Sequence, residues 1–197
     1  MHVTTKPRMT AQEFLAWDAT QIVRHEFVAG QLRVLHGEDE PQLAGTGEAH
    51  VTAALNVAMA LRQHLAGSPC RTFITDMKLR VQAADAYFYP DVMVTCSERD
   101  AADPLVKREP VLLVEVLSPA TAAFDRGDKF AAYRTLPTLR EVLLVDPDTR
   151  RCDLYRLGDQ GLWVLHPSAP GAGLRLASVE LDVGADALWA QVPAPQR

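Results

Sequence analysis

The sequence predicts an α/β fold in which a mixed central β-sheet is flanked by helices. An apolar strand, a helix and a second apolar strand follow one another over residues 111–117, 125–136 and 142–145. This order is typical of a crossover connection in an α/β protein. Hydrophobic residues make up 48% of the 197 residues and charged residues 23%, which supplies material for a core and excludes an intrinsically disordered chain.

The N-terminal part predicts a short helix followed by a hairpin. Thr10 and Glu13 have the spacing of a capping box ahead of an apolar stretch, so a helix should begin there. Two strands should follow over residues 24–28 and 31–35, with Ala29-Gly30 as the turn.

The middle of the chain predicts one longer helix and three strands. The helix should span residues 49–65, where apolar residues fall near one face. The strands should cover residues 73–81, 89–96 and 111–117, and the last has the apolar composition of a strand buried on both faces. The polar stretch 97–109 should be a connection.

The C-terminal part predicts an edge hairpin over residues 152–157 and 162–165 and a closing helix over residues 185–191. No linker is long enough to divide the chain. Residues 1–192 are therefore predicted to form a single domain, and residues 193–197 a flexible tail.

Charge and cysteine usage limit the partners and the compartment. The 20 Lys+Arg and 25 Asp+Glu residues give a net charge of −5, so nucleic acid should be bound only by a local patch or through metal ions. Cys70, Cys96 and Cys152 stand far apart, which predicts reduced, buried thiols rather than a disulfide framework or a zinc site. No apolar run could span a bilayer, so a soluble cytoplasmic protein without membrane contact is expected.

Two carboxylates stand where neighbouring strands can bring them together. Glu115 lies within an apolar strand, where a carboxylate is costly unless it is paired, protonated or bound to a metal. Asp91 opens the preceding strand, so the two acids can converge on one point. Converging carboxylates suit Mg²⁺, which prefers oxygen ligands. Alternatively, Asp91 caps a turn and Glu115 pairs with a buried Arg or Lys.

One helix could bring a lysine to these carboxylates. Asp125, Lys129 and Tyr133 recur at intervals of four residues and therefore share a helix face. The helix should begin near the end of the strand that carries Glu115, so Lys129 could reach the carboxylates. The alternative is an ordinary surface ion pair between Asp125 and Lys129.

A second lysine lies on the first long predicted strand. Asp76 and Lys78 are two residues apart and should share one face of strand 73–81. They are either a second source of a catalytic lysine or part of a solvated edge strand.

Several stretches together resemble the Uma-two restriction endonuclease family of the PD-(D/E)xK nuclease superfamily. In the second half they are Tyr89-Pro-Asp-Val-Met-Val94 and residues 110–119, 125–133 and 139–146. In the first half they are residues 9–15, 26–30 and 75–81, together with His50. Each motif is short, but their order and spacing cover nearly the whole chain and are specific in combination.

The resemblance implies a restriction-endonuclease-like core with an N-terminal helix and hairpin and a C-terminal edge hairpin. It also implies that Asp91 and Glu115 are magnesium ligands, with Glu26 as the acidic residue that completes such sites. The motif lysine is expected two residues after Glu115, where this chain has Leu117. Lys129 resembles the family's substitute for it, and Lys78 is the competing candidate.

The implied function is Mg²⁺-dependent hydrolysis of phosphodiester bonds in nucleic acid, with DNA as the expected substrate and Mn²⁺ as an alternative metal. Lys129 would stabilise the attacking water or the charge on phosphorus. His50 is either a phosphate contact or a helix-face histidine, and Tyr133 either packs or supports the site. Since nucleases of this kind commonly act as pairs, a homodimer is expected.

Two other classes of function remain open at the level of sequence. Leu117 at the motif position and the net negative charge favour a catalytically weak nucleic-acid-binding or regulatory module that retains the nuclease fold. An oligomeric structural protein would instead use the apolar C-terminal part, although such residues are more often core.

Overall fold

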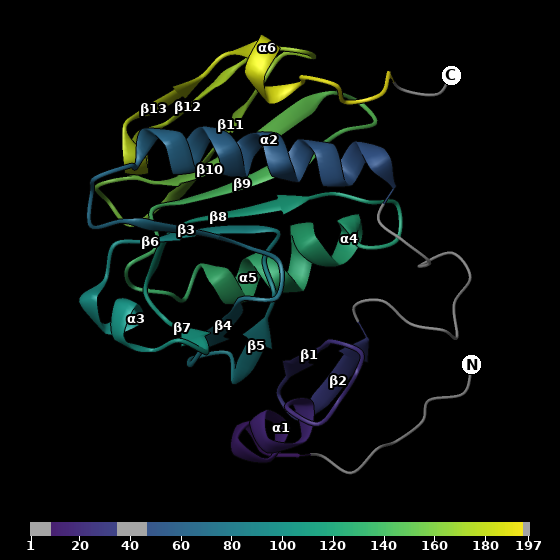
Figure 1. Ribbon diagram of the computed structural model, residues 1–197, viewed down its shortest axis with the longest axis vertical. Helices are drawn as coiled ribbons and strands as arrows, with labels where there is room; N and C mark the ends of the chain where they lie inside the picture. Colours follow the sequence, from purple (N-terminus) through teal and green to yellow (C-terminus); the bar gives the residue numbers. More distant parts are fainter. Residues whose placement is uncertain (1–8, 35–46, 195–197) are drawn as a thin grey trace.

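A mixed six-stranded sheet forms the centre of the computed structural model, which describes residues 9–34 and 47–194. Its strands in chain order are β3 (Arg71–Ile74), β6 (Val92–Thr95), β8 (Pro110–Val116), β9 (Glu141–Asp146), β10 (Arg151–Leu157) and β11 (Trp163–Pro167). They lie in the order β11-β10-β9-β8-β6-β3 (Figure 1). β8 and β9 are parallel, whereas the other neighbours are antiparallel. The predicted α/β class and mixed sheet are confirmed.

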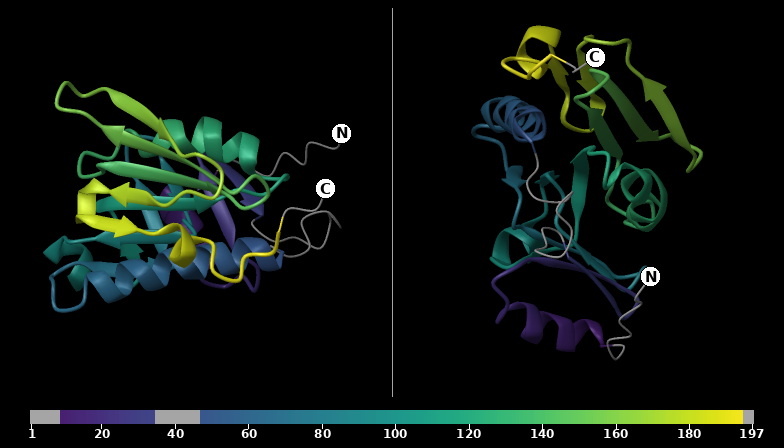
Figure 2. Two further views of the ribbon diagram at one scale, coloured as in Figure 1. Left: turned by 90° about the horizontal axis from the view of Figure 1, so that it is seen from above. Right: turned by 90° about the vertical axis from the view of Figure 1, so that its right-hand side faces the viewer.

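Helices cover both faces of this sheet (Figure 2). α2 (Glu48–His64) packs on one face, and a continuous helical segment over residues 122–133 packs on the other. This segment consists of α4 (Ala122–Phe124), a π-helical turn (Asp125–Lys129) and α5 (Phe130–Tyr133). Alternation along β8 explains the two cores, because Leu112 and Val114 face α2 while Leu113 faces the helical segment.

A second sheet forms the N-terminal layer. Its strands are β1 (His25–Val28), β2 (Gln31–Val34), β4 (Lys78–Val81), β5 (Ala86–Phe88) and β7 (Val106–Lys107), and they lie in the order β2-β1-β5-β4-β7. α1 (Ala11–Asp18) closes this layer, and its Phe14 ring stacks 5.1 Å from the Phe27 ring. The predicted capping box at Thr10 and the predicted hairpin are confirmed, except that Leu35 lies outside the described residues.

Two predictions about the middle of the chain are wrong. The strand predicted over residues 73–81 is divided into β3 and β4, which belong to different sheets, because Asp76 has a positive φ of 69° and turns the chain. The stretch 97–109, predicted as a connection, contains α3 (Glu98–Ala102) and β7.

The C-terminal part contains the predicted edge hairpin, formed by β10 and β11. An unpredicted second hairpin follows, formed by β12 (Leu174–Leu176) and β13 (Leu181–Val183), and the closing helix α6 (Ala185–Leu188) is shorter than predicted. Of the predicted tail, residues 195–197 lie outside the described part.

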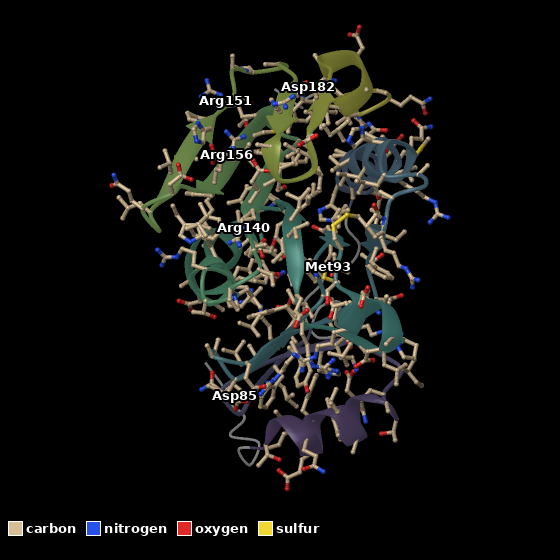
Figure 3. The ribbon with its side chains drawn as sticks, turned by 90° about the vertical axis from the view of Figure 1, so that its left-hand side faces the viewer. Asp85, Met93, Arg140, Arg151, Arg156 and Asp182 are labelled. Atoms are coloured by element: carbon tan, nitrogen blue, oxygen red, sulfur yellow. A yellow bond between two sulfur atoms is a disulfide. The ribbon has the colours of Figure 1, made fainter. Side chains whose placement is uncertain are left out.

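The prediction of three reduced cysteines is wrong for two of them. Cys70 and Cys96 form a disulfide, drawn in yellow in Figure 3, with their Cα atoms 3.9 Å apart. Antiparallel pairing of β3 with β6 sets Arg71 opposite Thr95, so the cysteines come level one residue further along. Cys152 is a buried free thiol as predicted, and burial raises its pKa to about 12. No helix within the described residues has the length and apolar character needed to cross a membrane.

Candidate active site

A buried lysine is surrounded by carboxylates between the two sheets. The Nζ atom of Lys129 lies 3.0 Å from Glu115 Oε2, 3.1 Å from Glu26 Oε1 and 3.5 Å from Asp125 Oδ1. All four side chains are buried, with Glu115 3% and Lys129 4% exposed. The alternative of a surface ion pair between Asp125 and Lys129 is therefore wrong.

Three elements bring these groups together. Glu115 comes from β8 in the central sheet, Glu26 from β1 in the N-terminal sheet, and Lys129 from the π-helical turn. The hydroxyl of Tyr133, one helical turn further on, donates a 2.5 Å hydrogen bond to Glu115 Oε1. Both oxygens of Glu115 are therefore held by side chains from the helical segment.

Asp91 stands beside this group, one residue before β6. β6 and β8 pair Val92 with Val114, so Asp91 lies level with Glu115. Its Oδ2 accepts a 2.7 Å hydrogen bond from the backbone N–H of Val116, and its Oδ1 lies 3.1 Å from Nε2 of His50 on α2. The two carboxylates therefore converge as predicted, and His50 is a partner of Asp91. We call Glu26, Asp91, Glu115 and Asp125 the carboxylate cluster.

The carboxylate cluster sets four acidic side chains against the single ammonium of Lys129. Burial raises the pKa of Glu115 well above its usual value, and the nearby Asp125 and Asp91 add to this effect while Lys129 opposes it. Burial alone would lower the pKa of Lys129, but Glu115, Glu26 and Asp125 raise it well above its usual value. Lys129 is therefore charged at neutral pH, and the cluster has an excess of acidic groups that a further cation would neutralise.

Carboxylate oxygens, which the cluster provides, are the type of ligand that a hard divalent cation prefers. Mg²⁺ is usually bound by one or two carboxylates together with waters and substrate phosphates. Within residues 9–34 and 47–194, no three Asp, Glu, His or Cys side chains are placed to hold one ion together. Asp91 and Glu115 could therefore supply two ligands, and the remaining positions would belong to water or substrate.

A cavity of about 530 Å³ gives access to the carboxylate cluster. Its floor includes Glu115, Asp91 and Lys129, and its walls come from α2, the β1–β2 hairpin and residues 118–125. A small polar site at the base of a larger, partly apolar cavity is typical of a ligand or active site.

Lys78 and Asp76, the other predicted site residues, do not reach the carboxylate cluster. Lys78 donates a 2.7 Å hydrogen bond to Oδ2 of the buried Asp18, which also accepts one from the Tyr89 hydroxyl. Asp76 is exposed at the rim of the cavity and pairs with Arg24 at 3.2 Å. Of the two lysines that the sequence offered, Lys129 is the one that reaches the carboxylates.

Comparison with known proteins identifies the family of the chain. The family model Uma2, described as "Putative restriction endonuclease", matches residues 11–186. The chain belongs to the Uma2 family. Two proteins of Synechocystis sp., slr1290 and sll1609, are each 32% identical to it, over 93% and 84% of this chain and 92% and 90% of their own lengths.

A solved structure shares the fold of this Uma2 protein. It is a crystal structure from Anabaena variabilis, described as "a putative nuclease belonging to DUF820". It matches with a TM-score of 0.75 at 16% identity and covers 94% of this chain and 99% of that chain. The predicted restriction-endonuclease-like fold is therefore confirmed.

Two residues of the Uma2 site were absent from the predicted set of site residues. The sequence places Asp125 on the same helix face as Lys129 but predicts no role for it in the site. Arg33 lies opposite Glu26 in the β1–β2 pairing, and its guanidinium lies 4.0 Å from the centre of the Phe124 ring. The two-residue turn at Ala29-Gly30 fixes this pairing, so the predicted hairpin by itself implies that Arg33 lies opposite Glu26.

Proposed function

We propose that this Uma2 protein is a metal-dependent endonuclease that hydrolyses phosphodiester bonds, with DNA as substrate. The observation that carries the proposal is the meeting of Asp91, Glu115 and Lys129 at the floor of an accessible cavity. Hard oxygen ligands beside a buried cation suit chemistry on a phosphate, in which negative charge develops on the reacting group.

Asp91 and Glu115 would hold Mg²⁺, or Mn²⁺ in its place. When bound there, the ion would polarise the phosphate and lower the pKa of a bound water. The excess of carboxylates over Lys129 supports this assignment, because a divalent cation restores the charge balance of the cluster.

The remaining residues of the site would orient the reacting groups. The Lys129 ammonium would stabilise negative charge on the phosphate or on the attacking water, while Glu26 and Asp125 hold it in place. Tyr133 fixes the orientation of Glu115, and His50 fixes that of Asp91. Each reactive group would thus be positioned before the substrate arrives.

The test is cleavage of labelled DNA by the purified protein in Mg²⁺ or Mn²⁺. Asp91→Asn and Glu115→Gln should each reduce the rate at least about 100-fold. Asp182→Asn is the matched control, because Asp182 lies on β13 in an exposed pair with Arg175, away from the cavity (Figure 3). Cleavage that persists in both site variants would refute the proposal.

The same samples distinguish the non-catalytic alternative. A binding or regulatory module would retain affinity for DNA without cleaving it, and titration calorimetry would show no Mg²⁺ binding that depends on Asp91 and Glu115. The cytoplasmic location and the homodimer stay predictions.

A further inference from the structure

The cavity above the carboxylate cluster has an apolar wall that the hydrolytic chemistry does not explain. Val51 and Leu55 lie one turn apart on α2 and line the cavity, yet they are 53% and 50% exposed. Ile74, at the end of β3, lines it as well and is also exposed. Large apolar side chains left in water around a polar site indicate a ligand with an apolar surface of its own.

The opposite side of the cavity carries a stacked cation and ring. The Arg33 guanidinium lies 4.0 Å from the centre of the Phe124 ring, and both residues line the cavity. Arg33 is paired with Glu26 across the hairpin, so its side chain lies on the strand face that points to the carboxylate cluster. Arg33 is exposed, whereas Phe124 is partly buried against the core below it. An Arg guanidinium supported by an aromatic ring provides a surface on which a nucleic-acid base can stack.

The depth of the reactive groups limits the form of the substrate. Glu115 and Lys129 are nearly inaccessible at the floor of a cavity of about 530 Å³. That volume is in the range of small-ligand sites and cannot admit a double helix. A strand whose bases are paired and stacked presents no base face to an apolar wall, whereas an unpaired nucleotide does.

The charge distribution agrees with a short, local contact. The chain has a net charge of −5, and duplex binding by neutralisation of many phosphates requires clustered Lys and Arg. At the cavity, Arg33 is exposed on the rim, and Arg24 lies there in a solvent-exposed pair with Asp76. These arginines could contact the one or two phosphates that flank a nucleotide in the cavity.

We propose that the substrate of this site is an unpaired segment of a nucleic-acid strand, whose base packs between the Leu55 wall and the Arg33–Phe124 stack. The proposal rests on the proposed nuclease function and specifies its substrate class.

The test compares one labelled DNA sequence as a single strand and as a blunt duplex. Cleavage of each is measured in Mg²⁺ or Mn²⁺, and binding of each by fluorescence anisotropy. The single strand should be cleaved at least about tenfold faster and bound more tightly. The reason is that a base paired within a duplex cannot stack on the side chains of the cavity.

Two variants on α2 form a matched pair. Leu55 and Met59 are both 50% exposed and lie one turn apart, but only Leu55 is among the residues that line the cavity. Leu55→Glu should weaken single-strand binding and cleavage about tenfold, whereas Met59→Glu should leave both unchanged. Because both side chains are exposed, neither substitution should unfold the protein.

The possible results separate this inference from the proposed function. If the duplex is cleaved as fast as the single strand and the two variants behave alike, the substrate class is wrong while the nuclease function stands. If neither form is cleaved, the nuclease function fails, and the anisotropy measurements decide the inference by themselves. Equal affinity for both forms would then overturn it.

Discussion

The ammonium of Lys129 lies 3.0 Å from the carboxylate of Glu115, although the lysine comes from the π-helical turn and the glutamate from β8. Leu117 stands two residues after Glu115, where the nuclease motif has lysine, and it is buried in the core that covers this face of the sheet. The helix therefore supplies the cation that the strand lacks.

Replacement of each candidate lysine in turn should show that Lys129, and not Lys78, is needed for cleavage. We expect Lys129→Met to reduce DNA cleavage about 100-fold or more, because charge on the reacting phosphate would lose its protein cation. Lys78→Met should keep the rate per folded molecule within a few-fold, since Lys78 pairs with Asp18 instead. Rates are compared after the folded fraction has been measured by circular dichroism. If Lys78→Met loses cleavage and Lys129→Met retains it, Lys78 rather than Lys129 is the lysine that serves the site.

The metal-free protein should lose stability as pH rises above the ordinary pKa of a glutamate, about 4.3. Burial raises the pKa of Glu115 in the folded state, so the folded protein holds a proton that the unfolded chain has released. The stability that this proton provides is complete at low pH and is lost as pH rises through the raised pKa. Urea unfolding in EDTA, compared with Glu115→Gln, isolates this contribution.

Added Mg²⁺ should reverse that loss. An ion that binds the ionised carboxylates stabilises the folded state, and its effect on Tm should be larger at pH 8 than at pH 6. Asp91→Asn should abolish most of the shift, and Asp182→Asn should not. An equal shift in wild type and Asp91→Asn would place the metal elsewhere.

The part of the site formed by neighbouring strands could be predicted from the sequence. Glu115 stands out because a carboxylate interrupts an apolar strand, and Asp91 begins the strand next to it. Strand alternation then fixes which face each side chain occupies. The position of Lys129 followed from helix periodicity and from the short connection after β8.

Features that depend on long-range contacts or on an isolated backbone angle could not be predicted. The division of residues 73–81 rests on the left-handed conformation of Asp76, which its residue type does not require. The stretch 97–109 looked like a polar loop, but Asp100 is fully buried and accepts hydrogen bonds from Thr95 and from the backbone of Arg108 and Glu109. Polar side chains are there part of the folded interior.

Asp103 should stabilise this region at neutral pH. A hydrogen bond from Arg108, with support from the backbone N–H groups of Leu105 and Val106, lowers the pKa of Asp103 to about 2. We expect Asp103→Asn to lower the free energy of unfolding by about 1 kcal/mol at pH 7, since the pair is partly exposed. This difference in stability should be lost as pH falls from about 4 to 2, because the wild-type carboxylate then becomes protonated and neutral, as the asparagine is.

Urea unfolding at pH 7 and pH 2 checks this expectation. Asp182→Asn is the control, because Asp182 is 72% exposed and its loss should change stability by less than about 0.5 kcal/mol. If Asp103→Asn is less stable than the wild type by the same amount at pH 2 as at pH 7, the charge of the Asp103 carboxylate is not the cause of the difference.

The Cys70–Cys96 disulfide should stabilise the central sheet without contributing to the chemistry. The bond joins β3 to β6 across a sequence separation of 26, and a loop of that size predicts about 3.5 kcal/mol from restriction of the unfolded chain. Cys70→Ser should lower the free energy of unfolding by up to this amount, and reduction of the wild type with dithiothreitol should have the same effect. Cys152→Ala leaves the disulfide intact and should respond to dithiothreitol as the wild type does. Reduced wild type and Cys70→Ser should be equally stable, because both lack the bond. If dithiothreitol leaves wild-type stability unchanged, the two cysteines are not bonded in solution.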